Sequence, residues 1–409
     1  MTSLVTLAAF AELAYVIVNI SAMPVYVRAI ALDARWIGVM TTAYLLMEGV
    51  FRSPFGVLGD RIGRKALIVT GPALSTLTAL LTPSVTNPFV LLFLRVLDGL
   101  GAAALWPAAF SLIGDHIPLE RRGAAMSQFN LAYLFGLALG PAIGGLINDA
   151  AHYVMHVPLA ASKQASFYAA ACLFAATTGI ALFALPGSQK AGVERDSSGT
   201  GVRDHSEARA FRLMLQRMPA TLLLAFLVFF GVGLVMAYMK IFVLETFRLT
   251  ESAFGLLMMG PAIVIGALSM VIGRMTDRFG KARTVRVGLT LCACAYWALL
   301  LVPQIWSLVV FGSLIGLGFV AAFPAWMALV SEASEPRLRG AAVGAVGTAQ
   351  GIGALLGASL SALLYRIPAT EIGPIPVPAH GVPFVACGVV LICAAILAQF
   401  AIREPGARM

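Results

Sequence analysis

The chain has 409 residues, of which 60% are hydrophobic and only 11% are charged. Water-soluble domains carry about 25% charged residues, so this composition excludes an ordinary soluble domain. The net charge of +9 would suit a nucleic-acid-binding protein, but the basic residues follow a membrane pattern, described below.

Apolar stretches of about 20 residues, the length of a membrane-spanning helix, recur along the chain. The expected spans are 4–28, 36–58, 66–86, 88–114, 123–148 and 164–186, followed by 218–245, 252–274, 284–303, 306–331, 340–365 and 382–402. The polar segment 187–217, rich in Gly, Ser and charges, is expected to be a linker. The sequence thus predicts an all-α membrane protein with two six-helix bundles, 1–186 and 218–409, joined by a cytoplasmic linker.

The basic residues lie mostly on one side of these predicted spans. Of the 28 Lys and Arg residues, 20 fall in the linker, the C-terminal tail and the loops on the same side, whereas 5 fall in the opposite loops. Basic loops are retained in the cytoplasm. We therefore expect a multi-pass protein of the cell membrane with both termini cytoplasmic, and the charge requires no nucleic-acid partner.

The two predicted bundles are related by an internal repeat. Adding 217 to a residue number of the first bundle leads to a related residue of the second over about ninety positions. Gly, Pro, Asp and Arg share this register, as in Leu97–Gly101 with Leu314–Gly318 and Pro107 with Pro324. Such repeats are typical of transporters that rock one half against the other around a site between them.

A loop motif occurs once in each half. The residues that form it are Gly56, Asp60, Arg61, Gly63, Arg64 and Lys65 in the first half and Gly273, Asp277, Arg278, Gly280 and Lys281 in the second. The pattern resembles the loop signature of the major facilitator superfamily, and the resemblance covers essentially the whole chain. We expect these residues, with Arg122 and Arg339, to act in conformational gating, because glycine permits tight turns and an Asp can cap a helix or pair with Arg.

The fourth span carries Arg95 and Asp98 within a run that resembles the family's R-x-x-Q-G-x-G-A-A pattern, with Asp98 where glutamine is commoner. A buried arginine needs a partner in the bilayer, and Asp98 is close enough along the helix to supply it. The pair is either a fixed structural lock or a proton-coupling pair.

The fifth span contains small residues at helical spacing. They are Gly136, Gly140, Pro141, Gly144 and Gly145. The run resembles a motif associated with antiporters in this family, although Ser127 stands where an earlier glycine is expected. Small residues let helices pack closely, and simple packing is the alternative reading of the same residues.

Other charges fall inside the predicted spans. Glu48 and Arg52, one turn apart, are expected to neutralise each other. Glu12 has no partner in its own span and is our first candidate for the proton-carrying group, because an isolated carboxyl in lipid favours its protonated form. Lys240 either snorkels to the interface or faces a cavity and an anionic group.

The family resemblance implies a cavity lined by helices 1, 4, 7 and 10. Candidate substrate-binding residues on those helices are Tyr15, Asn19, Trp106, Tyr238, Lys240, Phe323 and Trp326. The resemblance to twelve-span drug:proton antiporters favours proton-coupled efflux of an amphipathic compound by a monomer. Alternatives are proton symport of an organic anion or zwitterion, and translocation of a lipid or lysolipid.

Other classes of protein fit the sequence less well. A receptor or scaffold has no need of intramembrane charges or of two loop motifs, whereas this chain has both. No nucleotide-binding GxxxxGK[ST] or metal-binding HExxH occurs. We therefore expect no enzyme activity, cofactor or metal; the expected partners are a small-molecule substrate, protons and the lipid bilayer.

Overall fold

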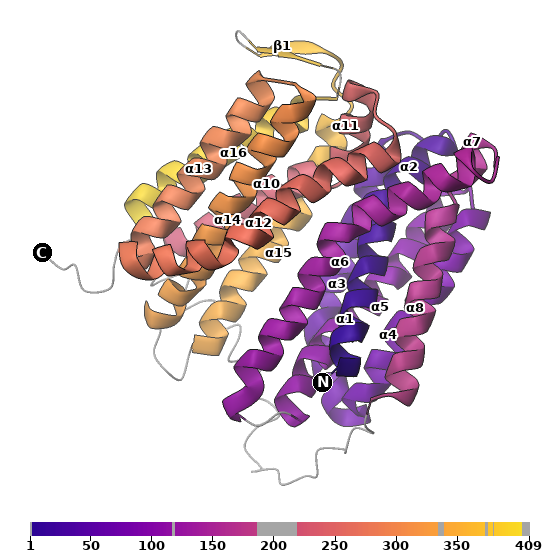
Figure 1. The fold of residues 1–409 in the computed structure, drawn as a ribbon, viewed down its shortest axis with the longest axis horizontal. Helices are drawn as coiled ribbons and strands as arrows, with labels where there is room; N and C mark the ends of the chain where they lie inside the picture. Colours follow the sequence, from indigo (N-terminus) through magenta and orange to yellow (C-terminus); the bar gives the residue numbers. More distant parts are fainter. Residues whose placement is uncertain are drawn as a thin grey trace, which may run out of the picture. The chain divides into compact units, whose positions relative to one another are not determined.

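The computed structural model describes residues 2–116, 119–185, 219–333, 339–372, 375–378 and 380–402, and almost all of them are helical (Figure 1). The predicted linker 187–217 lies outside this described part. The helices in the first half of the chain are α1 (Thr2–Val16), the π-helix Ile17–Ala22, α2 (Met23–Ala29), α3 (Arg35–Ile62), α4 (Arg64–Leu81), the short 3₁₀ turn Thr82–Ser84, α5 (Pro88–His116), α6 (Leu119–Tyr153), α7 (Leu159–Ser162) and α8 (Ala165–Phe183).

The second half of the chain repeats this order. Its elements are α10 (Pro219–Met236), α11 (Met239–Phe247), α12 (Glu251–Phe279), α13 (Lys281–Leu301), α14 (Ile305–Ala333), α15 (Arg339–Leu364) and α16 (Val382–Ala401), with a short antiparallel hairpin of β1 (Thr370–Ile372) and β2 (Ile375–Val377) before α16.

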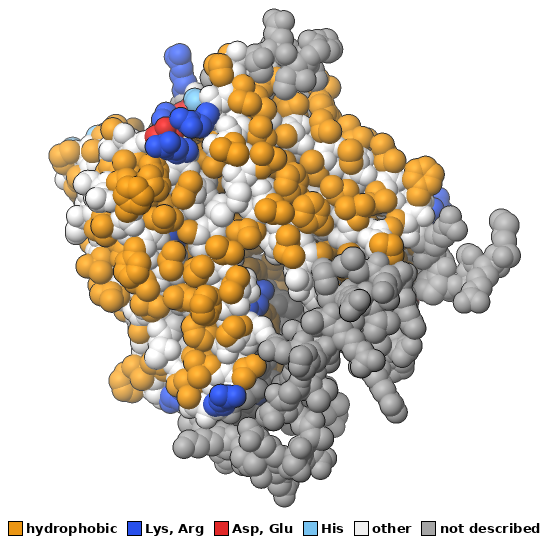
Figure 2. Space-filling view, turned by 180° about the vertical axis from the view of Figure 1, so that it is seen from behind, with side chains coloured by type: hydrophobic (Ala, Val, Ile, Leu, Met, Phe, Trp, Pro, Cys, Tyr) orange, Lys and Arg blue, Asp and Glu red, His pale blue; other side chains and the backbone are white. Residues whose placement is uncertain are grey.

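Eleven helices in the described part are long and apolar enough to cross a membrane. The expected span at 36–58 corresponds to α3, which has 28 residues but is less apolar because it carries Glu48 and Arg52. These two side chains form the expected ion pair, at 2.5 Å. Figure 2 shows many apolar side chains on the described surface of one face of the molecule, as expected for a helix bundle in lipid. The structure is therefore that of a multi-pass integral membrane protein.

The contacts divide the chain into two units. The first comprises Met1–Glu194 together with Ala237–Met258, and the second comprises Arg195–Met236 and Met259–Met409. The segment 237–258, which contains α11 and the start of α12, follows the linker in sequence but packs within the first unit. The contact boundary therefore differs from the boundary that we placed at the linker.

Each unit repeats the packing of the other at the offset of 217 residues. In the first unit α1 packs on α6, and α4 on α5; in the second, α10 packs on α15, and α13 on α14. A Cβ on Gly71 would lie 2.6 Å from the carbonyl oxygen of Gly101, and one on Gly288 would lie 2.6 Å from that of Gly318. The internal repeat of the sequence is thus a repeat of helix contacts.

The two loop motifs end their helices in the same way. Gly63 has φ 96° and Gly280 has φ 85°, a backbone region that favours glycine. By contrast, Gly56 and Gly273 lie inside α3 and α12, within the expected spans 36–58 and 252–274. The helices continue for six residues past them and end at Gly63 and Gly280.

Candidate functional site

Arg95 and Asp98 lie on one face of α5 and are buried together in the first unit. Their side chains form an ion pair with an Arg95 Nη1 to Asp98 Oδ2 distance of 2.6 Å, and each is less than 5% exposed. Arg95 also donates to Oδ1 of Asn19. Two charges of opposite sign are thus held in an environment where either one alone would be costly.

Aromatic side chains surround this pair. The guanidinium of Arg95 stacks over the ring of Tyr44, 4.8 Å from its centroid. The ring of Tyr15 contacts those of Tyr44, Trp106 and Phe174, with centroids 4.7–6.4 Å apart. The hydroxyl group of Tyr15 shares a 3.0 Å hydrogen bond with Ser75. We call Tyr15, Asn19, Tyr44, Arg95, Asp98 and Trp106 the Arg95 cluster.

Glu12 lies on α1 close to the same cluster. It is 5% exposed and hydrogen-bonds Tyr133 of α6, whose ring packs edge-on against Trp106, with 5.3 Å between centroids. Among the ion pairs of the described residues, none includes Glu12. Glu12 is therefore a buried carboxyl group with a hydrogen-bonding partner but without a cation.

A π-helical segment, Ile17–Ala22, interrupts the first span between α1 and α2. The N–H of Met23 bonds the carbonyl of Val18, five residues back, and Pro24 then follows without an N–H of its own. Asn19 lies on this segment and contacts Arg95. Short π-helical insertions often occur at functional sites, and here the insertion carries a side chain of the Arg95 cluster.

The glycines of α6 lie directly against this first span. A Cβ on Gly136 would lie 2.7 Å from the backbone nitrogen of Leu13 and 2.8 Å from Cβ of Glu12. One on Gly140 would meet Val16, and one on Gly144 would meet Ser21 at 2.5–2.6 Å. The glycine motif of α6 thus brings this helix close to the first span along three successive turns, next to Glu12, the candidate proton-carrying group.

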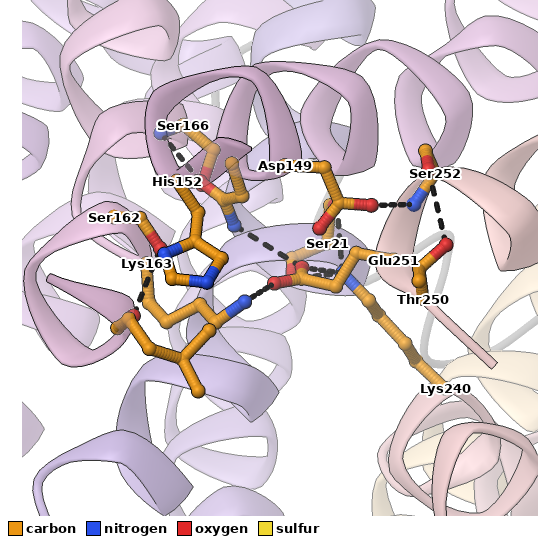
Figure 3. A network of polar contacts seen from close by, with 12 residues as sticks. Ser21, Asp149, His152, Ser162, Lys163, Ser166, Lys240, Thr250, Glu251 and Ser252 are labelled. Atoms are coloured by element: carbon orange, nitrogen blue, oxygen red, sulfur yellow. Dashed lines mark hydrogen bonds and ion pairs between the residues drawn. The ribbon is translucent and has the colours of Figure 1, made fainter. Parts of the chain in front are cut away.

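A second polar cluster is centred on Glu251, the first residue of α12 (Figure 3). One carboxylate oxygen accepts from Nζ of Lys240 at 2.5 Å and from Nδ2 of Asn148 at 3.1 Å. The other lies 2.7 Å from Nζ of Lys163. Lys240 also donates to the carbonyl and hydroxyl oxygens of Ser21, at 2.7 and 3.0 Å.

Neighbouring groups complete this cluster. Asp149 accepts the backbone N–H of Ser252 at 2.8 Å and so caps the start of α12. A Cβ on Gly145 would collide with the carbonyl of Glu251, which explains glycine at that position. The name Glu251 cluster is used below for Ser21, Asn148, Asp149, Lys163, Lys240 and Glu251. Two lysines and two acids there balance in charge.

Lys240 does not snorkel to the interface, so that sequence-based alternative is wrong. Its side chain is only 1% exposed, because α11 packs within the first unit and Glu251 neutralises the ammonium group. The anionic partner was missed because Glu251 begins its helix and looked like a loop residue. A carboxyl next to an apolar run, eleven residues after a lone lysine, was the available signal.

The remaining predicted residues lie elsewhere. Tyr238 is fully buried and its hydroxyl accepts the N–H of Gly38 and donates to the carbonyl of Ala34, both at 3.1 Å. Phe323 and Trp326 belong to the core of the second unit. They are not part of the Arg95 cluster.

The loop motif of the first unit ties helix ends together. Arg64 donates to the carbonyl of Ser111 at 2.5 Å, and Lys65 to that of Leu185 at 2.7 Å. Arg61 is exposed. The side chains of Asp60, Arg122, Asp277, Arg278 and Arg339 lie outside the described part, so their gating role stays a prediction. Within the described residues, no group of three or more His, Cys, Asp and Glu side chains could hold a metal ion.

In the described part of the chain, repeated contacts between membrane helices, with charged groups buried among them, are typical of transporters built from repeats. The model of the Major Facilitator Superfamily matches residues 4–220 and again 221–409, and the chain belongs to this family. It is therefore a transporter of small molecules and not an enzyme.

Three known proteins illustrate the similarity. Multidrug resistance protein 2 of Bacillus subtilis is 23% identical over 355 residues, which cover 85% of this chain and 84% of that protein. The quinolone resistance protein NorA of Staphylococcus aureus is 29% identical over 134 residues, 32% of this chain and 34% of that protein. The crystal structure of a D-xylose–proton symporter shares the fold, with a TM-score of 0.78, 15% identity and coverage of 100% of this chain and 99% of that one.

Proposed function

We propose that the protein exports an amphipathic, drug-like compound in exchange for protons, with Glu12 as the group that carries the proton. The observation behind this proposal is the position of Glu12. It is a buried carboxyl that hydrogen-bonds Tyr133, and none of the ion pairs of the described residues includes it. Burial in a low dielectric disfavours the charged form of such a group. It can therefore take up or release a proton when the substrate in the transport site changes.

The Arg95 cluster supports this role for Glu12. Arg95 and Asp98 already neutralise each other, so they leave Glu12 as the acid whose charge is not balanced nearby. The ring of Tyr133, the partner of Glu12, contacts that of Trp106, which contacts that of Tyr15. Such rings suit the flat, apolar parts of an amphipathic compound. The names of the two drug-resistance relatives agree with export of such compounds.

The test is proton movement in proteoliposomes that contain a pH-sensitive dye. Cationic, zwitterionic and anionic compounds are added to acid-loaded vesicles with the wild-type protein or with Glu12→Gln, which keeps a hydrogen-bond acceptor for Tyr133. We expect one class of compound to release protons and Glu12→Gln to abolish the release. Glu48→Gln, which removes an acid that already has Arg52 as partner, is the matched control and should retain coupling.

Uptake by proton symport is the second candidate. It is favoured by the shared fold with the D-xylose–proton symporter, although at 15% identity the likeness extends to the fold alone. The same vesicles separate the two directions, because a symporter moves protons and compound the same way. Compound binding without any proton movement would contradict both candidates and favour a uniporter or a lipid translocator.

A further inference from the structure

We propose that the second unit carries a binding site for a flat aromatic group with a neutral carbonyl oxygen, to which the side chains of Trp326 and Gln350 donate hydrogen bonds. The inference deepens the proposed function and rests on it in one respect, that the protein binds an amphipathic compound. It requires neither proton coupling nor a particular direction of transport.

Two buried N–H groups of the second unit have no acceptor among the described residues. They are Nε1 of Trp326 on α14 and the Nε2 group of Gln350 on α15. Both nitrogen atoms are shielded from water, and Trp326 as a whole is 2% exposed. A buried donor without a partner costs free energy, and native proteins contain few such groups. A bound compound that supplies an acceptor would remove this cost.

Phenylalanine rings lie along the same part of the unit. Phe319, Phe323 and Trp326 are four and three residues apart, so they share one face of α14. The rings of Phe319 and Phe323 stack with 5.4 Å between centroids, and each lies 6.3 Å from the ring of Phe229 on α10. The three phenylalanines are half-buried and pack against the core that contains Trp326. Part of their surface is therefore open to a flat ring.

Gln350 lies on the face of α15 that packs on α10. A Cβ on Gly353, three residues further along, would lie 2.4–3.0 Å from backbone atoms of α10. At the offset of 217, Gln350 corresponds to Tyr133, which hydrogen-bonds Glu12 in the first unit. Phe229 corresponds to Glu12. Because the helix contacts of the two repeats match, this correspondence places Gln350 next to Phe229.

The sequence of these helices specifies the charge of the acceptor. Asp, Glu, Lys and Arg are absent from α10, from α14 before Glu332 and from α15 after Arg339. A carboxylate buried there would have no cation to compensate its loss of water, which is costly. The oxygen of a ketone, amide or lactone needs only hydrogen bonds. The site therefore favours a neutral carbonyl compound over an organic anion.

The test compares fluorenone, a flat aromatic ketone, with fluorene, in which a methylene group replaces the carbonyl. Equilibrium binding of the two radiolabelled compounds is measured with the purified full-length protein in detergent. Because the compounds partition differently into detergent, the ratio of their affinities is compared between protein variants. Trp326→Phe and Gln350→Leu each remove one donor. The matched control is Trp297→Phe, since Nε1 of Trp297 already donates to the carbonyl of Gly388 at 2.9 Å.

We expect the wild-type protein to prefer fluorenone. The preference should fall about fivefold in Trp326→Phe or Gln350→Leu, the effect of losing one buried hydrogen bond, and further in the double variant. The infrared carbonyl band of bound fluorenone lies at lower frequency when the oxygen accepts hydrogen bonds, so it should move up in the same variants. Trp297→Phe should change neither the preference nor the band.

Equal weakening of fluorenone and fluorene in the donor variants would overturn the inference, because it would show that the two side chains only shape the core. A preference that the double variant retains would also overturn it, as would failure of the wild-type protein to bind fluorenone. Glu12→Gln should keep the preference while it abolishes proton release. The carbonyl site and the proposed proton coupling can therefore fail separately.

Discussion

The Arg95–Asp98 pair admits two roles that substitutions separate. If the pair only locks α5 in place, replacing both residues together should be tolerated. If the pair takes part in coupling, the double substitution should restore stability but not transport. The geometry allows both, because the 2.6 Å pair is buried and is also joined to Asn19 on the π-helical segment.

Asp98→Asn should lower the stability of the protein by about 3–5 kcal/mol, since it leaves the arginine charge buried without its partner. The double variant Arg95→Met/Asp98→Asn should recover much of this loss, as judged by the unfolding temperature in detergent. Proton-coupled transport by the double variant then decides the role. Recovery of transport together with stability would mean that the pair is a structural lock.

The sequence predicted this pair but missed the Glu251 cluster, and the difference is one of distance along the chain. Arg95 and Asp98 are three residues apart on one helix, so helical spacing alone brings them together. Glu251 and Asn148 are 103 residues apart, and their contact depends on how α6 meets α12. Side-chain spacing carries no information about such a contact. The partner of Glu12, Tyr133 of α6, was missed for the same reason.

At the scale of the helix, hydropathy predicted where the spans lie but not where they end. The repeat with an offset of 217 was also visible, because Gly, Pro, Asp and Arg share its register. The sequence did not tell which glycine of each loop motif forms the turn, since a glycine inside an α-helix and one with positive φ look alike in a sequence. Only the fold shows that Gly63 and Gly280 have the positive φ values.

Close packing of α6 on α1 predicts that an added methyl group will not be tolerated. Gly136→Ala should destabilise the protein by about 1–3 kcal/mol, the usual cost of overpacking, because its Cβ would lie 2.7 Å from the Leu13 nitrogen. Gly353→Ala should behave alike, since its Cβ would lie 3.0 Å from the Phe230 nitrogen at the matching contact.

The control for these variants is Gly179→Ala in α8. A Cβ there meets nothing within 4 Å, and alanine favours the helix by up to about 1 kcal/mol. Thermal unfolding of the three purified variants gives the comparison. A loss for Gly179→Ala equal to that for Gly136→Ala would show that helix contact is not the cause.

At the scale of the whole molecule, the distribution of basic residues predicts the orientation in the membrane. A cysteine in place of Val154, which is 73% exposed, should react from outside the cell with a reagent that does not cross membranes. A cysteine in place of Ile62, which is 50% exposed at the other end of the helices, should react only after the cells are opened. Both are made in the protein without native cysteines. The reverse pattern would contradict the cytoplasmic placement of the termini.

The two repeats share their helix contacts but not their charges. At the offset of 217, Glu12, Arg95 and Asp98 correspond to Phe229, Gly312 and Ile315. Phe229 packs with Phe323, the counterpart of Trp106, at 6.3 Å between ring centroids. At the matching positions, the second repeat thus carries apolar residues instead of charged ones. If protons are coupled to transport, this asymmetry assigns the proton-carrying groups to the first repeat.

A pair of matched substitutions tests this assignment. Ser75 shares a 3.0 Å hydrogen bond with the hydroxyl group of Tyr15, a member of the Arg95 cluster. Its counterpart Cys292 contacts only a backbone carbonyl, that of Ile315, at 3.2 Å. Ser75→Ala should slow proton-coupled transport about fivefold, the effect of losing a buried hydrogen bond of about 1 kcal/mol, whereas Cys292→Ala should change it less than about twofold. Equal losses in the proteoliposome assay would mean that both repeats carry the coupling, despite the absence of acids from the matching positions of the second.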